Sequence, residues 1–271
     1  MRGRVLIVAG SDSGGGAGIQ ADIKTITMLD AYAATAITAL TAQNTEGVFG
    51  VLPMPPEFIR RQIEVVLDDI GADVIKTGML HDAAVIEATV AVLQDRAAAL
   101  PVVVDPVMVA KGGARLIDPA ALKALTRLLI ARAEIVTPNL SEAEVLCSGT
   151  IGNMAEMRAA GETLLALGCR AVLVKGGHLS GETVSDVLVT AGRAKIWESP
   201  RIATRHTHGT GCTLASAIAA GIAQGLGVES AVDRARNYVQ RAIVGAPGLG
   251  RGHGPLDHAH PLRADRAPLD G

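Results

Sequence analysis

Short apolar runs alternate with longer stretches of helical period along most of the chain. The apolar runs are continuous and rich in β-branched residues, which is typical of strands buried on both faces. They predict strands at Val5–Ala9, Ala34–Leu40, Val74–Lys76, Val102–Val104, Ile135–Thr137 and Ala171–Val174. The stretches between them predict helices at Ile19–Leu29, Pro56–Ile70, Asp82–Gln94, Pro119–Ala131, Ser141–Leu146 and Met154–Leu167. This order predicts right-handed βαβ crossovers and an α/β fold with a mostly parallel sheet.

The pattern changes in the C-terminal third. Val184–Thr190 and Ala194–Ser199 predict a β-hairpin, and Gly211–Gln224 and Val228–Val244 predict two helices. The tail from 245 to 271 is rich in Gly, Pro, His and Asp and is predicted to be loop. Because no repeat and no linker interrupts the pattern, we expect one domain over residues 1–271.

Composition narrows the class of protein. Hydrophobic residues make up 49% of the 271 residues, and 25 basic against 27 acidic side chains give a net charge of -2. This balance and the 2% of aromatic residues argue against a nucleic-acid partner. No apolar run approaches the ~18 residues that cross a membrane, and no signal peptide is visible, so we expect a cytoplasmic protein. The three distant cysteines favour neither a disulfide framework nor a zinc cluster.

Ligands of open α/β sheets bind beyond the carboxyl ends of the strands, and polar segments follow each predicted strand here. After the first strand comes the glycine-rich segment Gly10–Gly18, whose backbone N–H groups can approach a ligand closely. It is neither a Walker A motif nor a G-x-G-x-x-G fingerprint, and it is either a substrate loop or a flexible turn. Asp22 lies one turn into the next helix, and we expect it to face the same pocket.

Two further strand ends carry single polar side chains. Gln43 follows the second strand, and its amide can donate and accept at once, which suits the edge of a nitrogen heterocycle. The alternative is a simple capping residue. Asp105 follows the strand Val102–Val104 and is placed either to reach a metal or a phosphate-bound water, or to start an Asp-Pro turn.

The next two strand ends combine carboxylates, an amide and a cation. Ser141 is the expected N-cap of its helix, with Glu144 as capping-box partner, and Glu142 is stabilised in the first turn. The functional alternative is that Asn139 and Glu142 hold Mg²⁺ through its waters. Lys175 precedes two glycines and is either a phosphate ligand or a solvated charge.

The segment Thr207–Thr213 opens an Ala-rich helix with Gly209, Thr210 and Gly211. Small residues at a helix start leave free N–H groups at the positive end of the helix dipole, where a transferring phosphoryl group is stabilised. Cys212 sits at the same helix start, so we expect its thiol to be more acidic than usual. The alternative is a glycine cap with a buried cysteine.

Taken in order, these segments closely resemble the hydroxymethylpyrimidine/phosphomethylpyrimidine kinases of the ribokinase superfamily. The resemblance runs from about Val5 to about Val244 and is most specific in Gly14–Asp22 and Thr207–Thr213. It implies a three-layer α/β/α fold with a mostly parallel central sheet and little or no lid. It also implies an activity: ATP-dependent, Mg²⁺-assisted phosphorylation of 4-amino-5-hydroxymethyl-2-methylpyrimidine and of its monophosphate in thiamine biosynthesis.

The resemblance implies a role for each candidate residue. Substrate binding falls to Gln43, Gly10, Asp22, Met79 and Val107. ATP binding falls to Asn139, Lys175, Thr207 and His208, and metal binding to Asp105 and Glu142. The catalytic group is Gly209, Thr210 and Gly211 as anion hole, with Cys212 where most ribokinase relatives carry an Asp base. The family tends to form dimers, so a homodimer is expected.

Several alternatives stay open at this point. A vitamin B6 kinase of the same fold phosphorylates a hydroxymethyl group on a pyridine, and the segment Gln43-Asn44-Thr45 favours the aminopyrimidine over it. A non-catalytic binding protein would have lost part of the site, and a dinucleotide-dependent oxidoreductase would show the fingerprint spacing. Residues 110–115 are predicted to close over the site as a flap.

Overall fold

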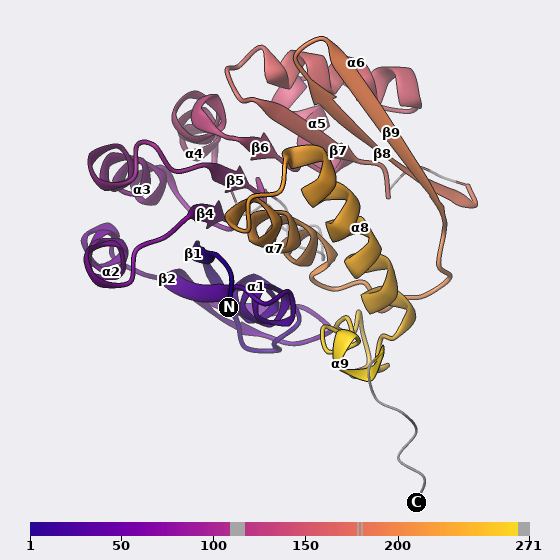
Figure 1. Ribbon diagram of the computed structural model, residues 1–271, viewed down its shortest axis with the longest axis horizontal. Coiled ribbons are helices and arrows are strands. Elements are labelled where there is room, and N and C mark those ends of the chain that lie inside the picture. The colour runs from indigo at the N-terminus through magenta and orange to yellow at the C-terminus, as the bar shows by residue number, and fades with distance from the viewer. Residues whose placement is uncertain (109–116, 178, 180, 265–271) are drawn as a thin grey trace, which may run out of the picture.

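A computed structural model describes residues 1–108, 117–177, 179 and 181–264. Within these residues one sheet has the strand order β3-β2-β1-β4-β5-β6-β7-β8-β9 (Figure 1). Its strands are β1 (Arg4–Asp12), β2 (Tyr32–Gln43), β3 (Val48–Pro53), β4 (Val74–Thr77), β5 (Val102–Val104), β6 (Ile135–Val136), β7 (Ala171–Lys175), β8 (Thr183–Thr190) and β9 (Arg193–Pro200). From β2 to β7 neighbouring strands are parallel, while β3, β8 and β9 join antiparallel at the two ends.

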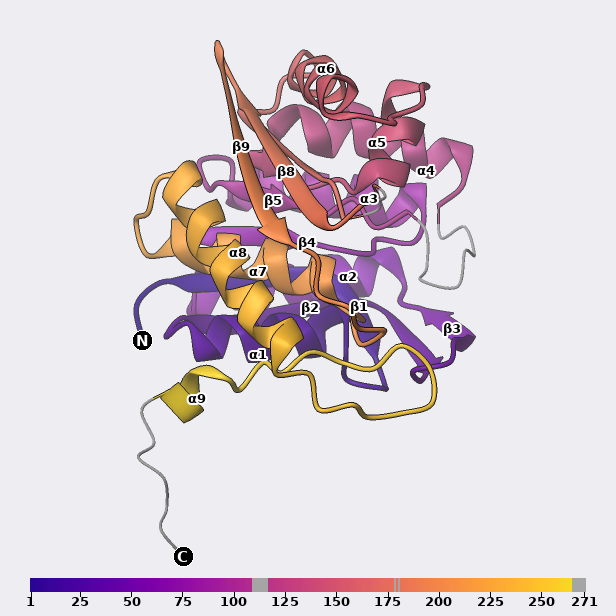
Figure 2. The same cartoon turned by 90° about the vertical axis from the view of Figure 1, so that its right-hand side faces the viewer.

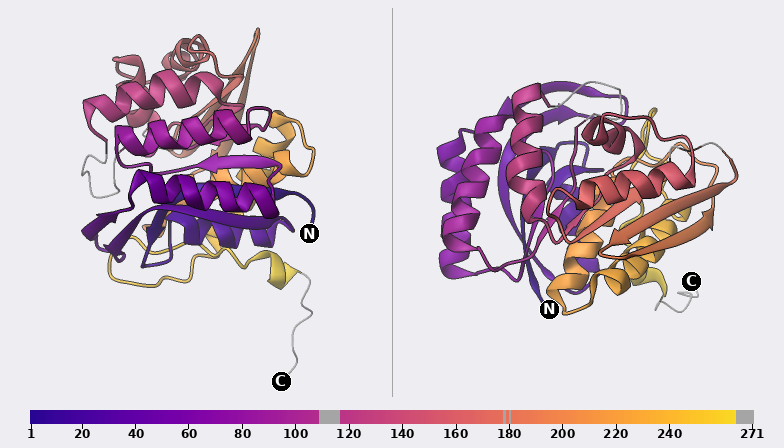
Figure 3. Two further views of the ribbon diagram at one scale, coloured as in Figure 1. Left: turned by 90° about the vertical axis from the view of Figure 1, so that its left-hand side faces the viewer. Right: turned by 90° about the horizontal axis from the view of Figure 1, so that it is seen from above.

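Helices cover both faces of this sheet and make three layers (Figures 2 and 3). On one face lie α2 (Pro56–Asp69), α3 (Ala83–Arg96), α4 (Pro119–Ala124), α5 (Leu140–Cys147) and α6 (Met154–Leu165). On the other face lie α1 (Gly18–Met28), α7 (Thr210–Ala223) and α8 (Val228–Val244). None of the helices in the described residues is long and apolar enough to cross a membrane.

Alternation along the central strands explains why both faces are covered. In β1 the side chains of Leu6 and Val8 join the core under α2 and α3, while Val5, Ile7 and Ala9 join the core under α1 and α7. Because successive residues of a strand point to opposite faces, a continuous apolar run needs helices on both sides. The α/β prediction with a mostly parallel sheet is confirmed.

Some elements differ from the prediction. Strand β3 was not predicted, since it pairs only with β2 at the sheet edge and all its residues are exposed. The helix predicted over Pro119–Ala131 is α-helical only to Ala124 and continues as a π-helical turn, Leu125–Leu129, and a 3-10 turn, Ile130–Arg132. The predicted flap at 110–115 lies outside the described residues.

The tail after α8 is not a free loop. It contains the short helix α9 (Pro261–Ala264) and runs beside the turn between β2 and β3, as the yellow segment of Figure 2 shows. The His253 amide donates to the Thr45 carbonyl at 2.8 Å, and Arg251 pairs with Glu46 at 3.0 Å. The tail therefore forms part of the wall at the carboxyl end of β2.

Candidate active site

The carboxyl ends of the parallel strands bring the predicted phosphate residues together. The Lys175 ammonium lies 3.1 Å from the Asp105 carboxylate, although 70 residues separate them. Thr137, at the end of β6, approaches the same Asp105 oxygen at 3.3 Å. Asp105 is 3% exposed, so this cation and carboxylate meet in a largely dehydrated corner.

Glu142 is the second carboxylate of this corner and is 4% exposed. Burial raises the pKa of Glu142 to about 7, and the nearby Asp105 carboxylate acts in the same direction against the Lys175 ammonium. Burial alone would lower the pKa of Lys175, but Asp105 and Glu142 raise it above its ordinary value. Lys175 is thus a fixed positive charge between two carboxylates.

The N-terminus of α5 differs from the prediction. Asn139, not Ser141, is the N-cap: its side chain accepts from the Glu142 amide at 3.0 Å, and the Glu142 carboxylate accepts from the Asn139 amide at 2.8 Å. Both spacings fit the capping-box signature. Strand β6 ends at Val136 and its chain is held to β7 through Pro138, so the N-cap lies two residues earlier than predicted. Asn139 and Glu142 are therefore structural partners before any ligand is considered.

The start of α7 lies directly over Lys175 and Asp105. Gly209 is the N-cap and adopts a left-handed conformation with φ 79°. A Cβ added to Gly211 would lie 3.2 Å from the Lys175 ammonium and 3.6 Å from an Asp105 oxygen. The Thr210 hydroxyl donates to the Thr207 carbonyl at 2.8 Å. The backbone amides of Gly211 and Cys212, in the first turn, have no acceptor within the helix. The predicted anion hole and the predicted phosphate cation are adjacent.

Cys212 contradicts the expectation of an acidic thiol. Burial raises its pKa to about 12, and the Asp22 and Asp105 carboxylates act in the same direction against the Lys76 ammonium. The dipole of α7 favours the thiolate, whereas burial and the negative charges of Asp22 and Asp105 disfavour it. Cys212 is a thiol rather than a thiolate at neutral pH.

Asp12, for which the sequence predicts no separate role, organises the glycine-rich loop. Its carboxylate accepts from the amides of Gly14 at 2.8 Å, Gly16 at 3.1 Å and Ala17 at 2.8 Å. Burial opposes ionisation, but the hydrogen bonds from His208, Ala17 and Gly14 outweigh it and hold the pKa of Asp12 below its ordinary value. The signal for this role was an Asp two residues before a run of glycines, an Asx-type turn starter.

Gln43, Gly10 and Met79 lie on the same side of the loop. A Cβ on Gly10 would meet the Met79 methyl group at 2.5 Å, so Met79 covers Gly10. The Gln43 amide lies 3.3 Å from the His208 ring, and this ring lies 2.8 Å from Asp12. The structure thus places His208, a predicted ATP contact, beside the glycine-rich loop, where its ring contacts Asp12 and Gln43.

Asp22, predicted to contact the substrate, is bonded to two neighbouring side chains. It has no exposed surface, and its carboxylate is held by Lys76 at 2.9 Å and by Ser216 at 2.7 Å. Lys76 is not among the predicted site residues, because a lysine at the end of a predicted strand is usually a solvated charge. Asp22 thus connects α1 to β4 and to α7 next to the site.

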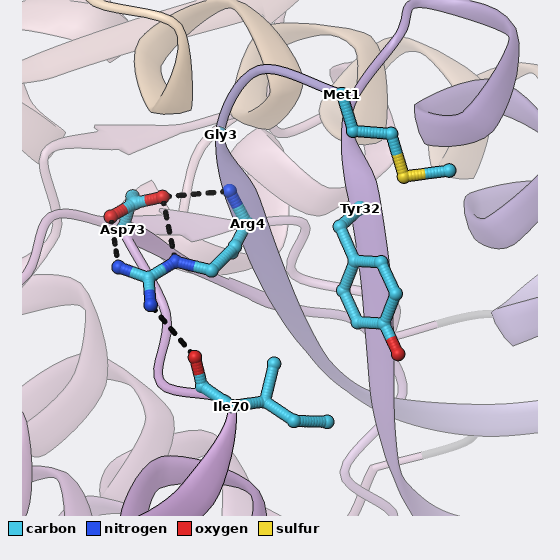
Figure 4. A pocket seen from close by; sticks show the side chains of 6 residues that line it. All are labelled: Met1, Gly3, Arg4, Tyr32, Ile70 and Asp73. Carbon is cyan, nitrogen blue, oxygen red and sulfur yellow. Dashed lines mark hydrogen bonds and ion pairs between the residues drawn. The ribbon is translucent and has the colours of Figure 1, made fainter.

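Hollows lie at both edges of the sheet, a large one at the amino ends of the strands and a small one beyond the carboxyl ends of β4 and β5. One of about 400 Å³ is lined by Met1, Gly3, Arg4, Tyr32, Ile70 and Asp73 at the amino ends of the strands (Figure 4). There Arg4 is engaged by Asp73 and by the Ile70 carbonyl, and the strand ends that carry the polar residues are on the opposite edge. Val107, predicted to contact substrate, lines a small hollow with Gly78, Leu80 and Pro106.

The donor set of the corner fits Mg²⁺ held largely through its waters. Among the described residues there is no cluster of three His, Cys, Asp or Glu side chains that could hold a metal by itself. Mg²⁺ commonly takes one or two carboxylates and completes its shell with water and phosphate oxygens. Asp105 and Glu142, both buried, would supply those two carboxylates.

The sequence matches the family model described as phosphomethylpyrimidine kinase over residues 12–257. It is 46% identical over 256 residues to the hydroxymethylpyrimidine/phosphomethylpyrimidine kinase of Bacillus subtilis, with 94% of each chain covered. It is 52% identical over 257 residues, 95% of this chain, to the thiamine biosynthesis bifunctional protein ThiED of Geobacter sulfurreducens. The chain spans 52% of the length of that bifunctional relative.

Solved structures agree on the fold. The Bacillus subtilis pyridoxal kinase in its ADP complex superposes with a TM-score of 0.89 at 36% identity, covering 97% of this chain and 99% of that one. The phosphomethylpyrimidine kinase of Clostridium difficile 630 superposes with a TM-score of 0.79 at 41% identity, covering 89% and 99%. The ribokinase-like α/β/α architecture expected from the sequence is confirmed.

Proposed function

The chain belongs to the phosphomethylpyrimidine kinase family, and we propose that it phosphorylates 4-amino-5-hydroxymethyl-2-methylpyrimidine and then its monophosphate, using ATP, in thiamine biosynthesis. The supporting observation is the adjacency of Lys175 and Asp105 to Gly211, at the same sheet edge as the Gln43 amide. A phosphate-binding half and a ring-binding half thus meet at the start of α7.

In the proposed transfer the alcohol oxygen attacks the γ-phosphorus of ATP. The bond from that phosphorus to the β,γ-bridging oxygen breaks, ADP leaves, and the alcohol proton passes to a base. Such transition states need positioning and charge stabilisation more than covalent help. The α7 amides at Gly211 and Cys212 and the Lys175 ammonium supply positive charge where negative charge spreads over the phosphoryl oxygens.

Asp105 and Glu142 are the residues proposed to hold Mg²⁺, which would neutralise charge on the transferring phosphates. Asn139 and Thr207 remain proposed contacts on the nucleotide side. Gln43 is the proposed contact of the aminopyrimidine, because an amide can accept from the ring amino group and donate to the adjacent ring nitrogen.

We also propose one kinase domain over the chain, a homodimer and a cytoplasmic location. The edge strand β3 exposes Phe49 at 72% and Leu52 at 60%, beside the exposed Val51 at 40%. An apolar edge strand of this kind is typical of a surface that pairs with another chain. Sedimentation at several concentrations of the wild type and of Phe49→Lys tests the dimer, which Phe49→Lys should weaken.

A vitamin B6 kinase is the second candidate, since pyridoxal kinases are among the solved structures that superpose on this chain. The deciding experiment compares ATP consumption with the pyrimidine alcohol and with pyridoxal, and identifies products by phosphorus NMR. We expect a clear preference for the pyrimidine and a pyrophosphate product. A clear preference for pyridoxal would overturn the substrate assignment.

Variants test the phosphate half in the same assay. Asp105→Asn and Lys175→Met should each lower turnover by a factor on the order of 10² or more, because each removes a charge aligned with the transition state. Lys123→Met is the matched control, since Lys123 is exposed on α4 away from the site. Turnover of Lys175→Met equal to that of the control would contradict the proposed phosphate role.

A further inference from the structure

His208 joins the glycine-rich loop to Gln43 through a chain of polar contacts. Its Nε2 lies 2.8 Å from Asp12 Oδ2 and 3.3 Å from the Gln43 amide nitrogen. The other end of the Gln43 amide lies 3.1 Å from the Thr41 hydroxyl, which donates to the Ser11 carbonyl at 2.9 Å. The His208 side chain is 12% exposed and that of Asp12 4%, so the chain of contacts is largely shielded from water.

The backbone around Gln43 is fixed independently of its side chain. The Ser13 hydroxyl accepts from the Gln43 amide N–H and donates to the Gln43 carbonyl, each at 2.8 Å. The His208 ring is seated against Gly16, because a Cβ on Gly16 would run into that ring. The remaining freedom at this point is the orientation of the Gln43 carboxamide.

The hydrogens available for donation decide the orientation of the Gln43 carboxamide. Asp12 accepts from three backbone amides and is ionised, so His208 Nε2 must carry a hydrogen to bond it. An N–H on Nε2 cannot accept from the Gln43 amide nitrogen. The single Thr41 hydroxyl hydrogen already goes to Ser11, so it cannot also serve the Gln43 oxygen. With its nitrogen toward His208 and its oxygen toward Thr41, the Gln43 carboxamide therefore makes neither of its two contacts as a hydrogen bond.

A half-turn of the carboxamide satisfies every contact. Gln43 Oε1 then shares the His208 Nε2 hydrogen with Asp12, and Gln43 Nε2 donates to the Thr41 hydroxyl oxygen. We infer that His208, oriented by Asp12, is a positioning residue that locks the Gln43 carboxamide with its oxygen toward His208 and its nitrogen toward Thr41. The inference deepens the proposed function, because it concerns the side chain assigned to the substrate ring.

A locked amide has a fixed hydrogen-bonding direction. One lone pair of Oε1 and one hydrogen of Nε2 remain for a ligand, side by side and in a set order. An aminopyrimidine edge offers a donor next to an acceptor, the same pattern that Gln and Asn recognise in adenine. A hydroxypyridine lacks this pair, so the lock disfavours it. A freely rotating amide would adapt to either ring, so the Asp12–His208 contact sets selectivity rather than turnover.

The first experiment reads the hydrogen on His208 directly and does not depend on the substrate. Nitrogen-15 NMR of the histidine rings is recorded at mildly alkaline pH, with His208→Gln used to assign the signal. We expect the chemical shift of a protonated Nε2. A bare, pyridine-like Nε2 would overturn the inference.

The second experiment measures kcat/KM for the pyrimidine alcohol and for pyridoxal in the wild type, His208→Leu and His208→Gln. Losing one aligned hydrogen bond should lower the pyrimidine value about tenfold, mainly through KM, and leave the pyridoxal value and the KM for ATP nearly unchanged. His208→Gln keeps an N–H close to the position of Nε2 and should restore the discrimination. His253→Leu, at an exposed histidine of the C-terminal tail, is the control.

The outcomes are distinguishable. Equal losses of kcat/KM for both alcohols would show that His208 is purely structural. A raised KM for ATP with unchanged discrimination between the alcohols would place His208 on the nucleotide side. Either result would overturn the inference. If the wild type does not phosphorylate the pyrimidine, the proposed function fails, while the NMR result still decides the state of the His208–Asp12 contact.

Discussion

Lys76 and Asp22 form an ion pair with no exposed surface, in which the ammonium lies 2.9 Å from both carboxylate oxygens. Ser216, one turn after Cys212 on α7, donates to the same carboxylate at 2.7 Å. Burial alone would lower the pKa of Lys76, but the Asp22 carboxylate raises it above its ordinary value. The pair therefore joins β4, α1 and α7 directly behind the candidate anion hole.

Removing one partner should destabilise the fold strongly. Asp22→Leu leaves the Lys76 ammonium buried and uncompensated, which we expect to lower the free energy of unfolding by about 3–5 kcal/mol. The double variant Asp22→Leu/Lys76→Met removes both charges and should recover most of that loss. Urea unfolding monitored by circular dichroism measures both. A double variant as unstable as the single one would show that packing, not charge compensation, governs this position.

The strands were predictable because burial on both faces leaves a continuous apolar signature. Val102–Val104 matches β5 residue for residue. Strand β3 could not be predicted, because its residues, Phe49 and Leu52 included, are exposed and show no pattern of buried and exposed positions. The N-cap of α5 was predicted at the wrong residue, because Asn139-x-x-Glu142 and Ser141-x-x-Glu144 both fit the capping-box signature. Only the end of β6 decides between them.

The polar residues at the strand ends could be predicted from the sequence, but the pairs of distant residues that hold the site together could not. The fold rule places Asp105 and Lys175 at one edge without knowledge of their distance. By contrast, Asp12 meets His208 across 196 residues of sequence, and Asp22 meets Lys76 across 54. No local pattern encodes such pairs, because they depend on how α1 and α7 dock on the same face of the sheet.

Gly209 should tolerate no side chain. Its φ of 79° disfavours other residues, and an added Cβ would overlap the Gly16 carbonyl oxygen. Gly209→Ala should push the glycine-rich loop away from α7 and lower turnover by a factor on the order of 10², since a displacement near 1 Å has this effect. Gly227→Ala is the control, because that position is open and has no positive φ. Steady-state kinetics and thermal unfolding measure both variants, and wild-type turnover in Gly209→Ala would contradict the close packing.

His258 should make the fold sensitive to acid. Burial lowers its pKa from 6.5 to about 4, and its Nε2 lies 3.0 Å from the Thr213 hydroxyl on α7. The unfolded chain therefore binds a proton before the native state does. Stability should fall as pH drops from about 6.5 to about 4, by about 3 kcal/mol in total, and should not depend on this group above that window.

His258→Gln tests this dependence. Glutamine can keep a bond to Thr213 but does not titrate, so the variant should lose less stability than the wild type between neutral pH and pH 4. Urea unfolding at both pH values measures the difference, and His253→Gln, at an exposed histidine, is the control. Equal acid losses in the wild type and His258→Gln would show that other groups dominate.

Cys212 is the most informative residue for the chemistry itself. Its pKa of about 12 leaves almost no thiolate at neutral pH. If the small thiolate fraction of Cys212 nevertheless accepts the alcohol proton, turnover should rise with pH as that fraction rises. In that case Cys212→Ala should fold normally and lower turnover by a factor on the order of 10²–10⁴, the usual contribution of a general base. Steady-state kinetics across neutral and alkaline pH measure both effects.

Two comparisons separate a base from a packing residue at this position. Cys147→Ala removes a partly buried thiol at the end of α5 and should leave turnover unchanged. Alkylation of Cys212 by iodoacetamide should be slow at neutral pH and accelerate with pH, because only the thiolate reacts. Near-wild-type turnover in Cys212→Ala would eliminate the base role while leaving the kinase assignment intact, because Lys175 and the α7 amides stabilise the phosphoryl charge without it.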